Sequence, residues 1–261
     1  MSIVIIGNGF IGRAISQTML ENRYKHICFN SEQFNLCDPN TWKIFPDNIE
    51  QVIFAAGKIC EDIEQLRIVN EDPVSMLCDF LNSKNVKKII ALSSGAVYGE
   101  YDQDRYVGLK CLPKTNYGVS KLNQENLFIA KWKKDLNILR LFFSYGPGQE
   151  VPRLVPGLLY KIKHEMPIKL NSNGGPILSL SHVKDIAECI LQDFLCNNNS
   201  KAIHNLSSSY KVSIYDLSKK LAKFLGKEPF FQQADQKSNN CTSVAYAFNW
   251  HRSGKFKDVF Q

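Results

Sequence analysis

The segment that decides the fold is Ser2-Ile3-Val4-Ile5-Ile6-Gly7-Asn8-Gly9-Phe10-Ile11-Gly12. A short apolar run typical of a strand ends in a G-x-G-x-x-G pattern, and a helical pattern follows over residues 10–20. The first glycine permits a tight turn, the second lets an anion approach the backbone, and the third lets the helix pack closely on the strand. Because free N–H groups at a helix N-terminus attract phosphate, the segment predicts a dinucleotide site. Its expected binding residues are Gly7, Gly9, Phe10, Ile11 and Gly12.

Strand-like and helical segments alternate along the first 143 residues. Apolar runs predict strands, and longer periodic stretches predict helices, at 2–6, 10–20, 26–29, 51–55, 61–83, 88–92, 116–133 and 137–143. Within 61–83, Pro73 predicts a break, with Asp72 capping a second helix. The alternation predicts an α/β fold, a doubly wound parallel sheet of the Rossmann type with helices on both faces.

The regular alternation of strand and helix patterns ends after residue 143. Residues 144–180 contain five prolines and an Asn-Gly-Gly turn, which predicts a loop-rich insertion around one helix near 153–164. A helical pattern returns over 182–196.

The composition is that of an ordinary globular protein. Apolar residues make up 44% and charged residues 22% of the 261 positions, which excludes a disordered or collagen-like chain. No apolar run approaches the ~18 residues of a membrane helix, and we expect no secretory leader and no membrane partner. The 8 cysteines are scattered without a C-x-x-C pair or metal-ligand spacing. We therefore expect reduced cysteines, no metal site and a cytoplasmic protein.

The formal net charge of +7 has two interpretations. It reflects either a lysine-rich solvated surface or a groove that attracts an anionic ligand such as a nucleotide. The basic residues form no run interleaved with aromatic residues, so we expect no nucleic-acid partner.

A Ser–Tyr–Lys set follows the predicted fourth strand. Ser94 ends that strand, and Tyr117 and Lys121 are spaced i, i+4 on one helical face. A free phenol titrates about three units above neutrality, so its ionisation costs roughly 4 kcal/mol, which a nearby ammonium reduces. Ser94 would hydrogen-bond a substrate oxygen, Tyr117 would exchange its proton, and Lys121 would bind the nicotinamide ribose. Alone, the Tyr and Lys could instead be exposed residues of an amphipathic helix, but their position after the glycine-rich loop favours catalysis.

Cofactor choice depends on the end of the second strand. This chain has Phe29-Asn30-Ser31 there, without the acidic residue that accepts the ribose hydroxyls of NAD. A neutral site tolerates a 2′-phosphate, and Arg13 and Lys58 are candidate donors to it. We therefore expect NADP(H), bound in part by Asn30 and Ser31. The alternative is NAD(H), with Asn30 bonded to its ribose.

These motifs together resemble the extended short-chain dehydrogenases/reductases of the NAD-dependent epimerase/dehydratase family, which act on nucleotide sugars. The likeness extends to Phe34-Asn35-Leu36-Cys37-Asp38, Ala55-Ala56-Gly57, Asn70, Tyr145-Gly146-Pro147 and Leu180-Ser181-His182-Val183-Lys184-Asp185. The resemblance implies further cofactor-binding residues, with Asn35 at the adenine, namely Asn35, Leu36, Ala55, Ala56, Gly57, Asn70, Tyr117 and Lys121. It also implies a dinucleotide domain over 1–143 plus about 181–203, and a substrate-binding lobe over 144–180 plus 204–261.

Departures from the family pattern narrow the expected reaction. Gly95 and Ala96 stand where dehydratases carry Asp-Glu, so dehydration is not expected. Phe143 and Leu178 stand where many members bind the substrate diphosphate through Asn and Arg. Arg153 either supplies a replacement charge or is a solvated surface residue. The expected substrate-binding residues are Ser94, Phe143 and Arg153.

We therefore expect an NAD(P)-dependent enzyme that reduces a nucleotide-linked 4-keto-6-deoxysugar. The same three residues would serve a 4-epimerase with tightly bound NAD, and a non-catalytic dinucleotide-binding regulatory protein would leave them idle. The resemblance further implies a homodimer through helices near 75–83 and 116–131.

Overall fold

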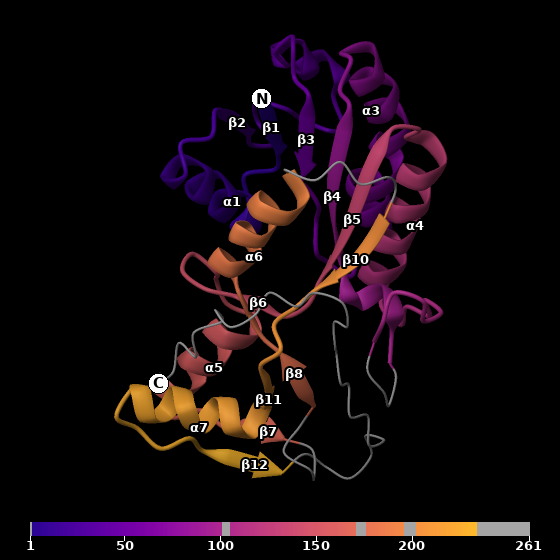
Figure 1. Ribbon diagram of the computed structural model, residues 1–261. Helices are drawn as coiled ribbons and strands as arrows, with labels where there is room; N and C mark the ends of the chain where they lie inside the picture. Colours follow the sequence, from indigo (N-terminus) through magenta and orange to yellow (C-terminus); the bar gives the residue numbers. More distant parts are fainter. Residues whose placement is uncertain (1, 101–104, 171–175, 196–201, 234–261) are drawn as a thin grey trace.

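The computed structural model describes residues 2–100, 105–170, 176–195 and 202–233 (Figure 1). Its main sheet has six parallel strands in the order β10-β5-β4-β3-β1-β2. The strands are β1 (Ile3–Ile6), β2 (His26–Phe29), β3 (Gln51–Phe54), β4 (Lys88–Ser94), β5 (Asp135–Leu141) and β10 (Ala202–Leu206). The chain winds outward from β1 in both directions, so the prediction of a doubly wound parallel α/β sheet is confirmed.

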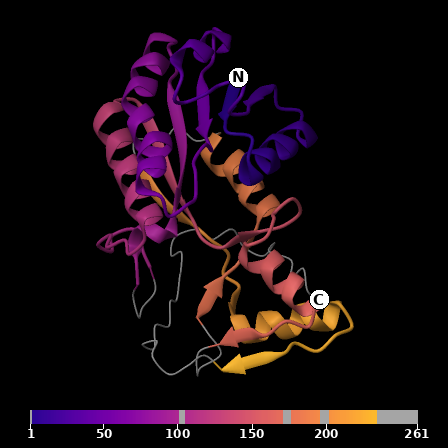
Figure 2. The same cartoon turned by 180° about the vertical axis from the view of Figure 1, so that it is seen from behind.

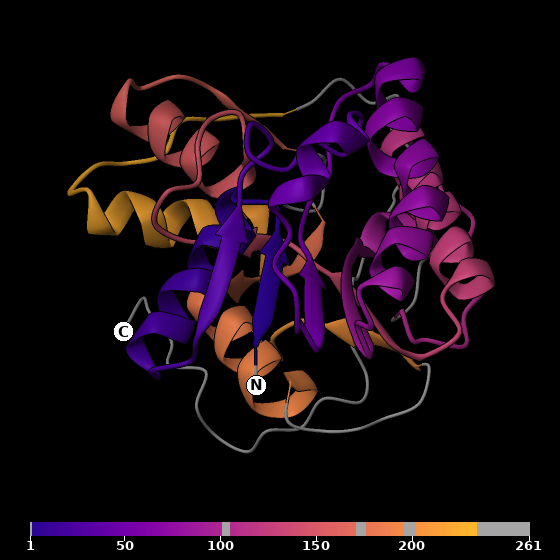
Figure 3. The same cartoon turned by 90° about the horizontal axis from the view of Figure 1, so that it is seen from above.

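Helices cover both faces of this sheet, as the view from above shows (Figure 3). One face carries α1 (Phe10–Glu21) and α6 (Val183–Cys189), and the other carries α3 (Asp72–Ser83) and α4 (Asn116–Lys131). Successive strand side chains point to opposite faces. Thus Ile3 and Ile5 pack in one core with α1 and α6, while Val4 and Ile6 pack in the other with α3 and α4.

A smaller lobe lies beyond the carboxyl ends of the strands (Figure 2). Its core joins α5 (Leu154–Lys163) and α7 (Ile214–Phe224) to short strands. These strands are β7 (Ile168–Leu170), β8 (Ile177–Ser179), β11 (Lys211–Ser213) and β12 (Phe231–Gln233). The parallel pair β6 (Ser144–Tyr145) and β9 (Ser181–His182) connects the lobe to the sheet.

The helix α3 begins at Asp72, next to the start predicted at Pro73, but the predicted interruption before it is wrong. Residues from α2 (Ile63–Leu66) to α3 stay helical through a π-helical turn over Arg67–Glu71. Asp72 has helical dihedral angles, φ −52° and ψ −42°, and so does not act as a cap. The wide π turn accommodates the proline, which lacks the N–H that an α-helix would need.

Three further boundaries differ from expectation. The fifth strand ends at Leu141 because the chain turns at Phe143, whose φ of 29° is left-handed. The helix expected over 182–196 continues past α6 as a π-helical segment, Ile190–Leu195. The expected domain boundary near 203 falls inside β10, which pairs along its length with β5. In the described part of the chain, no helix combines the length and apolar character needed to cross a bilayer.

A buried ion pair ties α4 to the sheet. Arg140 on β5 donates to both carboxylate oxygens of Glu125 on α4, at 2.6 to 3.3 Å, and both side chains are at most 4% exposed. Ser93 of β4 donates to the same carboxylate. Because a buried charge is costly without its counter-charge, this contact fixes how α4 lies across β4 and β5.

Glu125→Ala should destabilise the protein strongly, because it leaves the Arg140 guanidinium buried without its counter-charge. We expect the free energy of unfolding to fall by about 3–5 kcal/mol in urea denaturation. Glu64→Ala is the matched control, since Glu64 pairs with Arg67 on the surface and should leave the unfolding midpoint unchanged. Equal small effects of the two variants would contradict the role assigned to the buried pair.

Candidate active site

A cavity of about 1030 Å³ opens at the carboxyl ends of the central strands, between the sheet and the small lobe. Ligand sites in doubly wound folds lie at this edge, and the cavity reaches the upper end of the usual range of about 300–1,000 Å³. Twelve of the residues predicted from the sequence line it: Gly9, Phe10, Ile11, Arg13, Ala55, Ala56, Gly57, Ser94, Tyr117, Lys121, Phe143 and Arg153.

The glycine-rich loop forms one wall of the cavity. Gly7 has φ 110°, and a Cβ atom there would lie 2.5 Å from Ala56 N. A Cβ atom on Gly12 would lie 1.8 Å from Gly7 O, so both glycines are needed for the loop to close on itself and on β3. A Cβ atom on Gly9 would meet nothing within 4 Å.

Gly9 therefore leaves open space at the start of α1, where no side chain caps the helix and no acidic residue occupies the first turn. Unpaired N–H groups and the helix dipole make this a site for an anion. The loop therefore fits the pyrophosphate of a dinucleotide.

Ser94 and Tyr117 meet where β4 ends and α4 begins. Close backbone packing makes the contact possible, because a Cβ atom on Gly118 would lie 2.7 Å from Ala96 O. Ser94 Oγ accepts a hydrogen bond from Ala96 N at 3.1 Å, and Thr115 caps α4 through Gly118 N at 3.0 Å. These contacts fix both side chains at the cavity wall.

The surroundings of Tyr117 shift the pKa of its phenol. Burial raises its pKa, while a hydrogen bond with Ser94 and the positive charge of Arg153 act in the opposite direction. Arg153 precedes α5, so the small lobe brings a guanidinium towards the phenol. A phenol with a raised pKa remains protonated at neutral pH and is therefore a proton donor.

Lys121 is only 4% exposed but lines the cavity. Its ammonium donates to Leu92 O at 2.7 Å and to Gln124 Oε1. Burial lowers the pKa of Lys121 to about 8, and the charge of Glu125 opposes this shift. The amine therefore stays charged at neutral pH and can donate to a ligand.

Seven predicted cofactor-binding residues lie outside the cavity wall: Gly7, Gly12, Asn30, Ser31, Asn35, Leu36 and Asn70. Asn70 is completely buried, and its amide bonds both backbone groups of Lys58, at 2.8 and 3.0 Å, and Ser120 Oγ at 3.0 Å. It therefore positions the loop after β3, which carries Gly57.

The turn after β2 is closed by its own side chains. Asn30 Oδ1 accepts hydrogen bonds from Glu32 N and Gln33 N, at 3.0 and 2.9 Å. Asn35 Oδ1 likewise accepts from Cys37 N at 2.9 Å. The side-chain oxygen of Asn30 is thus engaged within the turn, and the side-chain NH2 group is the end that can contact a ligand.

The two candidate donors to a 2′-phosphate point elsewhere. Arg13 lines the cavity and donates to Gly148 O at 3.5 Å, towards the small lobe. The Lys58 ammonium donates to Gln65 Oε1 on α2.

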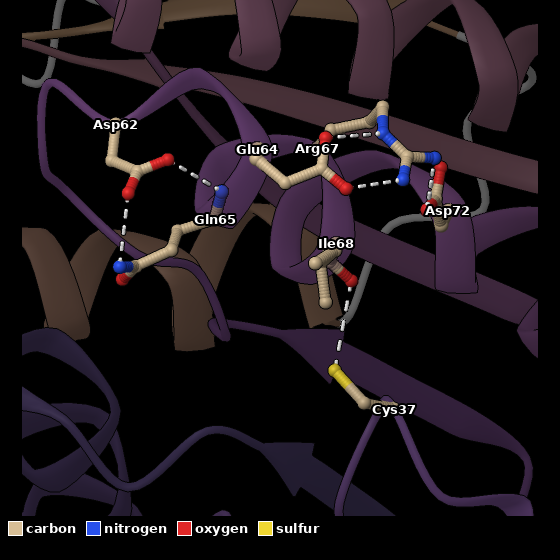
Figure 4. A network of polar contacts seen from close by, with 7 residues as sticks. All are labelled: Cys37, Asp62, Glu64, Gln65, Arg67, Ile68 and Asp72. Atoms are coloured by element: carbon tan, nitrogen blue, oxygen red, sulfur yellow. Dashed lines mark hydrogen bonds and ion pairs between the residues drawn. The ribbon is translucent and has the colours of Figure 1, made fainter.

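A polar network stabilises α2 and the π-helical turn, which follow the loop after β3 (Figure 4). Asp62 caps α2 by accepting from Gln65 N and Gln65 Nε2, both at 3.1 Å. Arg67 bonds Glu64 and Asp72, and so spans the π-helical turn. The Cys37 thiol donates to the carbonyl of Ile68 within that turn at 3.6 Å.

Two residues of the site, Gln124 and Arg105, are not predicted from the sequence. Gln124 contacts the Lys121 ammonium, and its i, i+3 spacing from Lys121 was a usable signal. Arg105 lines the cavity, is 3% exposed and donates to Gly99 O at 3.0 Å. No local pattern in the sequence indicates Arg105.

Comparison with known proteins gives relatives of both expected kinds. The chain is 26% identical to the dTDP-4-dehydro-6-deoxyglucose reductase of Escherichia coli over 81% of this chain and 77% of that one. It shares 24% identity with a trifunctional UDP-glucose 4,6-dehydratase/UDP-4-keto-6-deoxy-D-glucose 3,5-epimerase/UDP-4-keto-L-rhamnose-reductase of Arabidopsis thaliana. That match covers 55% of this chain but spans only 22% of the plant protein.

Among solved structures, the Thermus thermophilus UDP-glucose 4-epimerase in complex with NAD superposes with a TM-score of 0.78. The match covers 94% of this chain and 90% of that one at 19% identity, and so shows a common fold.

The family model described as the NAD dependent epimerase/dehydratase family matches residues 3–205, which is more than half of the chain. This match confirms the family resemblance predicted from the sequence. The protein is therefore a member of the NAD dependent epimerase/dehydratase family.

Proposed function

We propose that the protein is an NADPH-dependent 4-ketoreductase that acts on a nucleotide-linked 4-keto-6-deoxysugar. The observation that carries this proposal is the position of Tyr117, which lines the cavity together with Ser94 and Lys121. Reduction of one carbonyl needs a single proton donor. Gly95 and Ala96 add no acid or base beside Ser94, and Glu150 is the one carboxylate among the described residues that line the cavity.

In the proposed reaction each residue has one task. When bound, a reduced nicotinamide would supply the hydride that C4 of the sugar receives. Tyr117 donates its proton to the carbonyl oxygen, and Ser94 holds that oxygen by a hydrogen bond. Lys121 binds the nicotinamide ribose through its ammonium. The similarity to the Escherichia coli reductase supports this reaction.

The preference for NADPH is supported by the turn after β2. Asn30 offers its NH2 group rather than an acceptor, because Oδ1 is engaged by two backbone N–H groups. A donor suits the 2′-phosphate of NADPH, whereas an acceptor would suit the 2′-hydroxyl of NAD.

The sugar nucleotide would bind between the sheet and the small lobe, in a substrate lobe formed from residues 144–180 and those that follow β10. Arg13 and Arg153 line this side of the cavity and would bind the diphosphate, with Phe143 packed beside it. The proposed homodimer would form through α3 and α4, where Met76 and Ile129 are 47% and 39% exposed.

The proposed reaction predicts net consumption of NADPH with a nucleotide-linked 4-keto-6-deoxysugar, followed as the loss of nicotinamide absorbance. Tyr117→Phe should lower turnover by about 10²–10⁴-fold while NADPH binding is retained, because only the proton donor is removed. Tyr160→Phe, on the surface of α5, is the control and should turn over normally. Purification with about one tightly held dinucleotide per chain and sugar inversion without net consumption would instead identify a 4-epimerase.

Substitution by alanine should have different effects at Gly9 and Gly12, the second and third glycines of the motif. Gly9→Ala should fold like the wild type but lose about tenfold or more in NADPH affinity, because the methyl group fills the space for the pyrophosphate. Gly12→Ala should lower the unfolding temperature, since its methyl group meets Gly7 O. Fluorescence titration with NADPH and thermal unfolding separate the effects, and unchanged affinity in Gly9→Ala would refute the assigned site.

Asn30→Asp should shift cofactor preference towards NADH. The aspartate can still accept from Glu32 N and Gln33 N, so the turn persists while a negative charge meets the 2′-phosphate. We expect about a tenfold or greater loss of NADPH affinity and a smaller change for NADH. Asn48→Asp makes the same charge change just before β3, at the amino ends of the strands and opposite the cavity. It should alter neither affinity. Parallel losses for both cofactors in Asn30→Asp would contradict the NADPH assignment.

A further inference from the structure

Gln124 forms a bridge between Lys121 and the π-helical turn. Gln124 Oε1 accepts from the Lys121 ammonium, and Gln124 Nε2 donates to Asn70 O at 2.6 Å. The side chain is 2% exposed, so both ends of its amide are engaged inside the protein.

The orientation of this amide is determined by its partners. An ammonium can only donate and a backbone carbonyl can only accept, so a flipped amide would face both partners with the wrong group. Buried polar groups left unpaired are costly, so the bridge holds one arrangement.

The acceptor at the far end of the bridge is itself rigid. Asn70 lies in the π-helical turn, and its own side chain bonds the backbone of Lys58 and Ser120 Oγ. The bridge therefore links the lysine to a fixed point on a different element.

An ammonium carries three hydrogen atoms in tetrahedral geometry. Lys121 gives one to Leu92 O on β4 and one to Gln124. With two directions fixed, the third is fixed as well, and the cavity that Lys121 lines is where a ligand can accept it.

We infer that Gln124 is a positioning residue, which orients the Lys121 ammonium towards the ribose of a bound dinucleotide and supports its charged form. The inference rests on the role proposed above for Lys121. It adds to the Ser–Tyr–Lys set a residue that touches neither substrate nor cofactor and acts through the lysine.

Several charged or titratable groups surround Lys121 and must be kept constant in a test. Tyr117 and Glu125 lie on the same helix, and Glu125 is paired with Arg140 of β5. On the π-helical turn, Glu71 accepts from Asn123 at 3.0 Å. Asn123 thus links α4 to the same turn as Gln124 without touching the lysine, and provides a matched control.

The test follows the titration of Lys121 by NMR of isotope-labelled lysine Cε groups in the full-length protein, without added dinucleotide. Lys121→Arg identifies the signal by removing it. The wild-type signal should titrate near pH 8. Gln124→Met, which keeps the length but removes the acceptor, should lower this midpoint. Gln124→Glu should raise it by about one unit or more, because a carboxylate stabilises the ammonium.

Asn123→Ala should leave the midpoint unchanged, which separates positioning from a general effect on packing. Gln124→Met should also weaken NADPH binding about threefold to tenfold, the equivalent of one hydrogen bond. Equal midpoints in the wild type and both Gln124 variants, or a matching shift in Asn123→Ala, would overturn the inference. If the wild type binds no dinucleotide, the proposed function fails, whereas the NMR titration still decides whether Gln124 controls Lys121.

Discussion

The site depends on a row of contacts that one face of α4 makes with the end of β4 and the residues just after it. Gly118 packs on Ala96 O, Lys121 donates to Leu92 O, and Glu125 accepts from Ser93. These residues recur at helical spacing, so one face of α4 is fixed to the sheet by directional contacts. Apolar packing would tolerate small rotations, but buried polar groups must keep their partners. This row of contacts therefore sets the rotation of α4 that brings Tyr117 to Ser94.

A neighbouring side of α4 is held by the π-helical turn. Asn70 fixes the loop that carries Gly57 through its side chain and receives Gln124 through its carbonyl. Lys121 thus lies between two fixed acceptors, Leu92 O on β4 and Gln124 Oε1, and Asn70 O on the turn holds the Gln124 amide in place. Irregular helical turns are frequent at functional sites because they present backbone groups that a regular helix would use internally. Here the irregular turn accommodates Pro73. It also supports, through Gln124, the lysine proposed to bind the cofactor.

The small lobe completes the chemistry of the cavity. Arg153 comes from its first helix and lowers the cost of ionising Tyr117, opposing the effect of burial. Arg13 and Lys121 add further positive charge, against the single carboxylate of Glu150 in the described wall. A cleft with this balance attracts anionic ligands, which agrees with the interpretation of the net charge as a property of a nucleotide groove. Phe143 and Leu178 leave the diphosphate to these arginines in the function proposed here.

The parallel sheet, the glycine-rich loop and the spacing of Tyr117 and Lys121 can all be predicted from the sequence, because each depends on a local pattern. Alternating strands and helices admit few topologies, and G-x-G-x-x-G between a strand and a helix indicates a dinucleotide site. The tertiary structure alone decided that Pro73 lies within a continuous helix, that Asn30 turns its oxygen into its own turn, and that Gln124 links Lys121 to Asn70. It also brought Arg153 from the small lobe to the phenol. These features join residues that are distant in sequence or choose between equivalent side-chain orientations, and only packing in three dimensions makes that choice.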